Sequence, residues 1–423
     1  MMNAAQHRGL FSRVRLQAAS GVLVLSVFLP VVVAAQSAHE PTYSYKVLYD
    51  FCTSTNCPDG SLPQASLIQD AKGNLYGATP LTVFKLDKAG KETVLYTFGG
   101  GTDGEYSTSN LVRDSAGNLY GTTQSGGDLS CDAPYGCGVV FEVDSAGHET
   151  VLHSFEGGTD GMRPVVGLIR DSRGNFYGTT EFGGSTNDCG VAGWGCGTVF
   201  KLTKSGKETV LYTFAGGADS FMPEGGLVMD AKGNLYGTTY GGGTANPGTV
   251  FKVTKYGKET VLYTFRTGED GSAPMGSLAM DAKGNLYGTT SGNNGDSNGT
   301  VFKLTKAGRE TVLWRFQGAP DGREPQAGVV MDAAGNLYGT TLIGGSSSSC
   351  PQSGGCGTVF KLDKKGTDTV LYMFTGGSDG GFPRAGLFRD AKGNLYGTTT
   401  SGGYSNFCPY EGQGCGVVFK MTP

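Results

Sequence analysis

The chain contains 423 residues, of which 73 are glycine and 20 are tyrosine, and only 17% are charged. Glycine at this frequency without a triplet period excludes a collagen-like chain, and it favours many short strands joined by tight turns. The net charge of −4 and the lack of any Lys/Arg-rich block in the body of the chain argue against nucleic acid as a partner.

Residues 1–35 have the pattern of a secretory signal peptide. Three arginines lie in a segment without acidic residues, a largely apolar run follows over residues 21–33, and small residues precede Gln36. A membrane anchor is the alternative, but the apolar run is short for a spanning helix and contains a proline. We therefore expect cleavage after residue 35, a short linker over residues 36–42, and a secreted or periplasmic protein without a membrane anchor.

Three short motifs recur seven times, in a fixed order, over residues 43–423. The first, D-x-x-G-N-L-Y-G-T-T, is followed by T-V-F-K-L and then by T-V-L-Y-x-F, each with small variations. The Gly-Asn pair of the first motif suits a tight hairpin turn, and the other two motifs are rich in residues that strands favour. Two hairpins in a unit of about fifty residues predict one four-stranded antiparallel blade of a β-propeller.

The two ends of the repeat array complement each other. Residues 45–51 form a lone copy of the outermost strand, and residues 416–421 form a third strand that lacks its outer neighbour. A β-solenoid is the rival architecture, but it needs distinct caps, which the sequence does not show. We predict a single all-β domain over residues 43–423, a seven-bladed propeller whose N-terminal strand completes the last blade and closes the ring.

The ten cysteines come in five close pairs. In an exported protein such pairs predict local disulfides across loops, whereas their irregular spacing and the lack of neighbouring histidines argue against zinc. The pairs are Cys52/Cys57, Cys131/Cys137, Cys189/Cys196, Cys350/Cys356 and Cys408/Cys415.

The ordered motifs carry a family resemblance. The string G-N-L-Y-G-T-T, then G-T-V-F-K-L, T-V-L-Y-x-F and G-G-x-D-G, resembles the GloVer tandem repeat (Gloeobacter/Verrucomicrobia type) of exported bacterial proteins described as choice-of-anchor. The resemblance covers residues 43–421 and implies export and a repeat architecture. It implies no catalytic residues.

The residues that precede the aspartate of the first motif divide into two arcs around the ring. One arc has Arg-Gln-Arg-Arg and the other has three methionines. A basic arc could receive an anionic group, although arginine side chains that reach out from the channel mouth are the simpler interpretation. The three candidate ligand-binding arginines are Arg113, Arg170 and Arg389.

A second set of candidates follows the proline of each loop between blades, where a propeller entrance would be lined. These residues share no chemistry: Gln64, Thr108, Val165, Glu224, Met275, Gln326 and Arg384. Glu224 and Arg384 are the charged members and therefore our other ligand-binding candidates.

The acidic and imidazole side chains give no complete catalytic or metal site. Histidine is nearly absent, so a histidine base or metal ligand is not expected, and we predict no metal and no cofactor. Loop aspartates such as Asp219 could bind calcium, but an Asp-Gly pair in every unit is more typical of a turn.

These observations favour a monomeric, non-catalytic binding or scaffolding propeller for an extracellular glycan or protein. The alternative is a secreted polysaccharide hydrolase or lyase that uses paired acids such as Asp219 and Glu224. The two hypotheses differ in whether carboxylates from different blades meet in one cleft.

Overall fold

The computed structural model describes residues 43–184, 189, 193–243, 246–268, 270–292, 298–346, 348, 350, 352–404, 407–408 and 414–423. The predicted signal peptide and linker lie outside these residues. No helix in the described part of the chain is both long enough and apolar enough to span a membrane.

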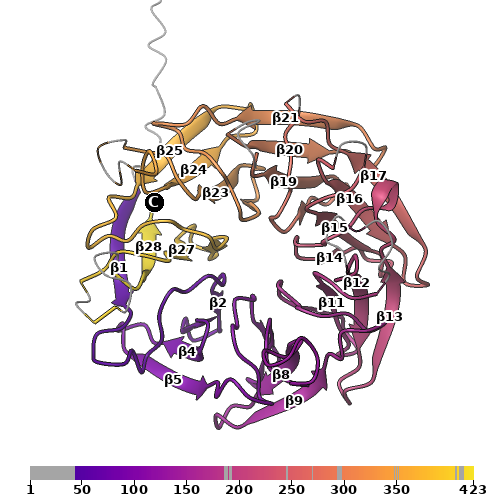
Figure 1. Cartoon of the computed structure of the whole chain (residues 1–423). Coiled ribbons are helices and arrows are strands. Elements are labelled where there is room, and N and C mark those ends of the chain that lie inside the picture. The colour runs from indigo at the N-terminus through magenta and orange to yellow at the C-terminus, as the bar shows by residue number, and fades with distance from the viewer. Residues whose placement is uncertain are drawn as a thin grey trace, which may run out of the picture. The chain divides into compact units, whose positions relative to one another are not determined.

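The described residues form seven four-stranded antiparallel sheets, as the repeats predict. Each sheet is one blade, and the blades follow one another around a ring (Figure 1). We letter the strands of a blade a to d from the centre outward. The a strands are short and have two residues each.

The first four blades are β2 (Ile68–Gln69), β3 (Leu75–Ala78), β4 (Thr82–Leu86) and β5 (Glu92–Thr97); β6 (Val112–Arg113), β7 (Leu119–Thr123), β8 (Val139–Val143) and β9 (Glu149–Ser154); β10 (Ile169–Arg170), β11 (Phe176–Thr180), β12 (Thr198–Leu202) and β13 (Glu208–Thr213); and β14 (Val228–Met229), β15 (Leu235–Thr239), β16 (Thr249–Val253) and β17 (Glu259–Thr264). The last three are β18 (Ala279–Met280), β19 (Leu286–Thr290), β20 (Thr300–Leu304) and β21 (Glu310–Arg315); β22 (Val330–Met331), β23 (Leu337–Thr341), β24 (Thr358–Leu362) and β25 (Asp368–Met373); and β26 (Phe388–Arg389), β27 (Leu395–Thr398), β28 (Val417–Thr422) and β1 (Ser44–Asp50). A 3₁₀ turn, η1 (Gly217–Asp219), lies between blades 3 and 4.

The N-terminal strand closes the ring. β1 pairs antiparallel with β28, with Ser44 opposite Thr422 and Asp50 opposite Val417. In Figure 1 the two strands lie side by side, although one opens the described chain and the other ends it. The predicted closure is confirmed, and it leaves the β28 edge covered.

A pair of phenylalanines joins each blade to the next. The phenylalanine that ends each third motif meets the phenylalanine in strand c of the following blade edge to face, with ring centroids 5.0 to 5.4 Å apart. Such an aromatic pair adds about 0.5–1.5 kcal/mol beyond the area that it buries. The pairs are Phe51–Phe84, Phe98–Phe141, Phe155–Phe200, Phe214–Phe251, Phe265–Phe302, Phe316–Phe360 and Phe374–Phe419.

The glycine of the Y-G-T-T sequence makes room for this ring. Gly237 lies opposite Phe251 in the β15–β16 pairing, and a Cβ at Gly237 would lie 2.7 Å from Phe251 Cζ. The corresponding distance is 2.5 to 2.7 Å in all seven blades. Any larger residue at this position would therefore displace the aromatic ring that joins the blades.

The aspartate, asparagine and tyrosine of the first motif hold the a-to-b hairpin. Asp230 Oδ1 accepts hydrogen bonds from the backbone N–H groups of Lys232 and Asn234, both at 2.9 Å. Its Oδ2 accepts from Asn234 Nδ2 at 2.7 Å and from Tyr236 Oη at 3.1 Å. Although burial opposes it, this set of hydrogen bonds lowers the pKa of Asp230.

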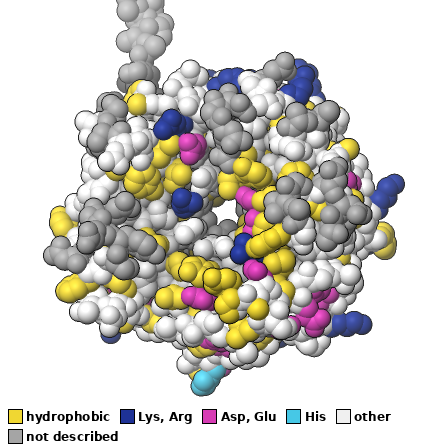
Figure 2. Space-filling view, viewed as in Figure 1, with side chains coloured by type: hydrophobic (Ala, Val, Ile, Leu, Met, Phe, Trp, Pro, Cys, Tyr) yellow, Lys and Arg dark blue, Asp and Glu magenta, His cyan; other side chains and the backbone are white. Residues whose placement is uncertain are grey.

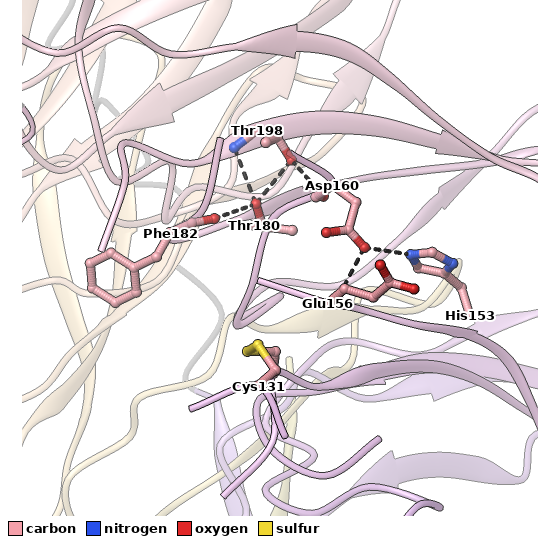
Figure 3. A network of polar contacts seen from close by, with 8 residues as sticks. Cys131, His153, Glu156, Asp160, Thr180, Phe182 and Thr198 are labelled. Atoms are coloured by element: carbon pink, nitrogen blue, oxygen red, sulfur yellow. Dashed lines mark hydrogen bonds and ion pairs between the residues drawn. A yellow bond between two sulfur atoms is a disulfide. The ribbon is translucent and has the colours of Figure 1, made fainter. Parts of the chain in front are cut away.

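The two threonines of the motif connect separate loops. The hydroxyl of Thr179 donates to the carbonyl of Pro223 in the next blade, at 3.1 Å. The hydroxyl of Thr180 pairs with that of Thr198 at 2.9 Å, and Thr198 donates to the carbonyl of Asp160 (Figure 3). The motif is therefore repeated because each of its polar side chains makes a structural contact in the blade.

The loop aspartates also make structural contacts. Asp219 accepts from Tyr212 Oη at 2.5 Å and from the N–H of Ala215 at 2.6 Å, which fixes the turn from strand d to the next strand a. Between blades 2 and 3 the tyrosine is replaced by His153, whose Nε2 lies 3.4 Å from Asp160 Oδ2 (Figure 3). The interpretation of these aspartates as turn residues is confirmed.

The aromatic contact between blades generates the first prediction. Gly237→Ala should destabilise the protein by about 1–3 kcal/mol, because the added methyl group overpacks the site against Phe251. Gly158→Ala is the matched control, since no atom lies within 4 Å of its Cβ position and its φ is not positive. Equal melting temperatures of the two variants would contradict this account of the motif.

Half-buried carboxyls at the blade boundaries generate a prediction about pH. Burial, with a contribution from a nearby loop aspartate, raises the pKa of each to about 7. They are Glu92, Glu149, Glu208, Glu259, Glu310 and Asp368. The unfolded chain releases these protons from about pH 4.5 upward, whereas the folded protein keeps them until about pH 7.

The melting temperature should therefore fall as pH rises from about 5 to 8, because the unfolded state binds fewer protons over this range. Glu259→Gln combined with Glu310→Gln should flatten the fall, whereas Glu156→Gln, at an exposed site, should leave it unchanged. A melting temperature that rises over the same range would show that these carboxyls are ionised in the folded state.

Candidate functional site

The residue directly before the proline of each loop between blades has a left-handed backbone conformation. Arg163, Met222 and Phe382 have φ of 53°, 55° and 55°. Such values are costly for residues with a side chain, so the surrounding structure must hold them. The set is Leu62, Tyr106, Arg163, Met222, Ala273, Glu324 and Phe382, with Tyr106 preceding a serine instead of a proline.

All five predicted cysteine pairs are bonded in the structure. The disulfides are Cys52–Cys57, Cys131–Cys137, Cys189–Cys196, Cys350–Cys356 and Cys408–Cys415. The prediction of local disulfides across loops is confirmed, and the second cysteine of four of them is fully buried. Cys196, for example, packs in a core cluster with Phe214 and Phe221. Cys196 is therefore a core residue as well as half of a disulfide, and it is not on the wall of the central cavity described below.

The disulfide loops support the left-handed backbone. In four of them the carbonyl of the second cysteine accepts the N–H of the left-handed residue. The distances are 3.0 Å from Met222 to Cys196, 2.9 Å from Arg163 to Cys137 and 2.7 Å from Phe382 to Cys356. The loops between strands b and c therefore position the loops that enter strand a.

The residues directly after these loop prolines line one cavity of about 570 Å³ at the centre of the ring. All seven residues of the second candidate set, including Glu224 and Arg384, are on its wall. Figure 2 shows charged and hydrophobic side chains around the central opening on this face. The sequence therefore identified the lining position correctly, while its role in ligand binding remains a prediction.

Two carboxyl groups from neighbouring blades line this cavity. Glu224 lies in the loop that leads into strand a of blade 4, and Glu181 directly follows β11 of blade 3. Burial raises the pKa of Glu224 to about 8, and the negative charge of Glu181 adds to the rise. Burial raises the pKa of Glu181 to about 7, against the opposing charge of Arg163. At neutral pH the pair therefore holds at least one proton, and it can donate as well as accept hydrogen bonds.

Apart from Arg384, the rest of the lining is uncharged and combines polar side chains with apolar ones such as Val165 and Met275. Arg384 Nη1 lies 3.5 Å from Gln326 Oε1, and Gln124 Nε2 donates to Thr108 Oγ1 at 2.6 Å. Among the described residues of the cavity wall, Arg384 is the one basic side chain. The wall thus combines amides, hydroxyls, aliphatic side chains, one guanidinium and a proton-holding acid pair.

The three arginines of the basic arc lie elsewhere. Arg113 and Arg389 end the short a strands β6 and β26 and are not on the cavity wall, and neither is Arg170. Their guanidinium groups lie over aromatic rings, Arg113 over Tyr76 at 5.4 Å and Arg389 over Tyr338 at 5.5 Å. The structure does not bring them to Glu224 and Arg384, and anion binding by this arc stays a prediction.

The predicted pairing of Glu224 with Asp219 is wrong. Asp219 is absent from the cavity wall, because its carboxylate is used by Tyr212 and Ala215 in the turn. The partner that sequence reasoning missed is Glu181. One signal could have found it: the position after G-T-T holds an acid in this one repeat and neutral residues or proline in the others.

Solved structures with a similar fold include the virginiamycin B lyase from Staphylococcus aureus, which is 13% identical with a TM-score of 0.58 and is covered over 99% of its length by 90% of this chain. A streptogramin B lyase is 13% identical with a TM-score of 0.56, covering 90% of this chain and 97% of its own. At this identity the likeness shows the propeller fold alone. No match was found among curated proteins.

The repeat itself gives the relationship. Three overlapping segments, residues 36–192, 130–351 and 184–408, match the model of the Gloeobacter/Verrucomicrobia repeat. Together these segments span residues 36–408. They include every copy of the three motifs except the last copy of the second motif, at residues 417–421. The chain therefore belongs to the Gloeobacter/Verrucomicrobia repeat family.

Proposed function

We propose that the chain is an exported, non-catalytic binding module whose central cavity takes a unit of an extracellular glycan. The observation that carries the proposal is the wall of the cavity, where amides and hydroxyls from several blades line the same space as the Glu181 and Glu224 pair and several aliphatic side chains. Saccharide hydroxyls both donate and accept, and a wall of mixed donors and acceptors satisfies them without a net charge to neutralise.

The proton on the acid pair matters to this function. A cavity with two ionised carboxylates and one guanidinium would repel acceptor groups and remain strongly hydrated. With one or both carboxyls protonated, the cavity can bury a neutral ligand without leaving a charge unpaired. The raised pKa values of Glu181 and Glu224 support binding near and below neutral pH.

The setting proposed for this activity is outside the cytoplasm, either secreted or periplasmic. Five disulfides fit an oxidising compartment, and the family match is in keeping with export. We propose a monomer that is not anchored to the membrane and does not bind nucleic acid.

A secreted polysaccharide hydrolase or lyase is the second candidate. It is favoured by one observation, that Glu181 and Glu224 come from different blades and line the same cavity. Glu224, with the higher pKa, would act as the general acid, and Glu181 as its more readily ionised partner. Two solved propellers of similar fold are lyases, which shows that the scaffold can support such chemistry.

Glu224 variants distinguish these functions. For binding, we expect Glu224→Gln to retain affinity for a neutral oligosaccharide, because the amide replaces the protonated carboxyl, and Glu224→Leu to lose about tenfold or more. Wild-type affinity should weaken as pH rises through about 8, while that of Glu224→Gln should weaken less, because only Glu181 still titrates there. Calorimetric titration with neutral oligosaccharides, repeated at several pH values, measures the affinities of the wild type, Glu224→Gln and Glu224→Leu.

The same samples of protein and oligosaccharide are also tested for turnover. Release of reducing or unsaturated ends by the wild type but not by Glu224→Gln would establish the enzyme instead of the binding module. Absence of any cavity-dependent binding across the panel would overturn the proposal. Substituting Arg113, Arg170 and Arg389 with methionine tests the basic arc, and unchanged binding of an anionic ligand would exclude it.

A further inference from the structure

Exposed large hydrophobic side chains gather on three consecutive blades. Six of them lie in loops that enter strand a or connect strands b and c of blades 7, 1 and 2: Leu81, Tyr106, Leu129, Tyr135, Tyr404 and Phe407. We call these six residues the aromatic surface. The other two exposed large hydrophobics of the described chain, Tyr256 and Met373, lie in the c-to-d turn of blade 4 and in strand d of blade 6.

The six residues share one face of the ring. An isolated antiparallel bridge joins Glu105 to Ser125, which places the loop of Tyr106 beside the b-to-c loop of blade 2. The N–H of Ser107 donates to the carbonyl of Pro80 at 3.0 Å, which joins Tyr106 to the loop of Leu81. Hydrophobic side chains are visible over the blades of β1, β5 and β9 in Figure 2.

The backbone beneath this surface is held in place. Tyr106 is the left-handed residue of its loop, with φ of 59°, and its side chain is 50% exposed. Tyr135 lies within the loop closed by Cys131–Cys137, and Phe407 precedes the cysteine of another disulfide. A supported backbone reduces the conformational entropy that the loops themselves lose when their aromatic side chains bind a partner.

The charge of the surface restricts the partner. The loops that carry the six residues, 79–82, 98–111, 124–138 and 399–416, and the neighbouring loop 51–67 contain no lysine or arginine, and they include acids such as Glu105 and Asp128. Arginines do occur in other loops of this face, at Arg163, Arg323 and Arg384. Arg163 Nη2 lies 3.6 Å from Asp132 Oδ2, and Arg384 Nη1 lies 3.5 Å from Gln326 Oε1. The loops that carry the six residues have none. A polyanion, whether nucleic acid or an acidic polysaccharide, would find no basic group in these loops.

Most of the other residues in these loops are glycine, serine, threonine and asparagine. The surface is therefore a set of separate aromatic faces in a polar setting, without the arginine and methionine that enrich the cores of protein interfaces. A pyranose ring has apolar C–H faces and polar hydroxyl edges. Its faces can pack on tyrosine rings while its hydroxyls meet polar side chains and water.

We propose that the aromatic surface binds a neutral polysaccharide chain that runs across blades 7, 1 and 2. The inference rests on the proposed glycan-binding function and adds a second site to the central cavity. The two sites adjoin, because Thr108 and Gln124 of the cavity wall lie in the same loops of blade 2 as Tyr106 and Tyr135. A chain bound on the surface would hold its neighbouring units near the cavity entrance.

The test is affinity electrophoresis of the mature protein in native gels containing hydroxyethyl cellulose, xyloglucan, galactomannan or pullulan, with polygalacturonate as the anionic polymer. The variant combines Tyr135→Ala and Tyr404→Ala with Tyr106→Asn, since asparagine tolerates the left-handed backbone. We expect retardation of the wild type by at least one neutral polymer and about tenfold weaker binding by the triple variant.

Two controls separate the surface from other causes. Tyr256→Ala removes a tyrosine that is 85% exposed on the opposite face, and it should be retarded like the wild type. Glu224→Leu weakens only the cavity, so it should keep the part of the retardation that the aromatic surface provides, which the triple variant loses. Loss of retardation in Glu224→Leu but not in the triple variant would assign binding to the cavity alone and overturn this inference.

Other results would overturn it too. Retardation by none of the neutral polymers, or equal retardation of the triple variant and the wild type, excludes a glycan on this surface. Self-association of the wild type in sedimentation, abolished in the triple variant, would assign the surface to a second copy of the chain. Retardation by polygalacturonate alone would contradict the argument from charge.

Discussion

The edge-to-face contact between two phenylalanines at each blade boundary is the interaction on which the rest of the structure depends. Phe214 and Phe251 meet across one boundary with centroids 5.1 Å apart, and the same contact recurs at the other six. It requires a residue without a side chain beneath the ring, which Gly237 and its six equivalents supply. Because a ring of blades has no terminal cap, each wedge must meet this requirement, and so the same letters recur along the chain.

The repetition of such contacts in every blade explains which features the sequence could predict and which it could not. The blade boundaries, the ring closure by β1 and the cavity-lining position of Glu224 follow from repeated letters, since repetition reports contacts that every blade shares. Glu181 was missed because it occurs once, at a position where other repeats hold neutral residues or proline. Asp219 was overvalued because sequence cannot show that Tyr212 already uses its carboxylate. Shared contacts are readable from one chain, whereas the relation between unlike residues of two blades requires coordinates.

The disulfides connect the frame to the candidate site. In six blades the loop from b to c offers a backbone carbonyl to the left-handed residue that enters the next strand a, and in four of these blades that carbonyl belongs to a bonded cysteine such as Cys196. Where no disulfide is present, Pro247 and Asn298 supply the carbonyl instead. The bond is thus not required for the geometry of a blade. It holds in place the longer loops, whose length would otherwise cost conformational entropy when they are ordered.

The side chains that line the cavity are not needed to hold the blades together. Val165, Met275 and Glu224 occupy equivalent positions after a proline, and the backbone that carries them is held by bonds from neighbouring segments, such as that from Thr179 to the carbonyl of Pro223. Their chemistry can therefore differ from blade to blade without a change in the fold. It follows that the candidate ligand-binding side chains are arranged asymmetrically on a nearly symmetric scaffold. The acid pair belongs to blades 3 and 4 and the aromatic surface to blades 7, 1 and 2, so a ligand that contacts both must extend across the opening instead of lying along the axis.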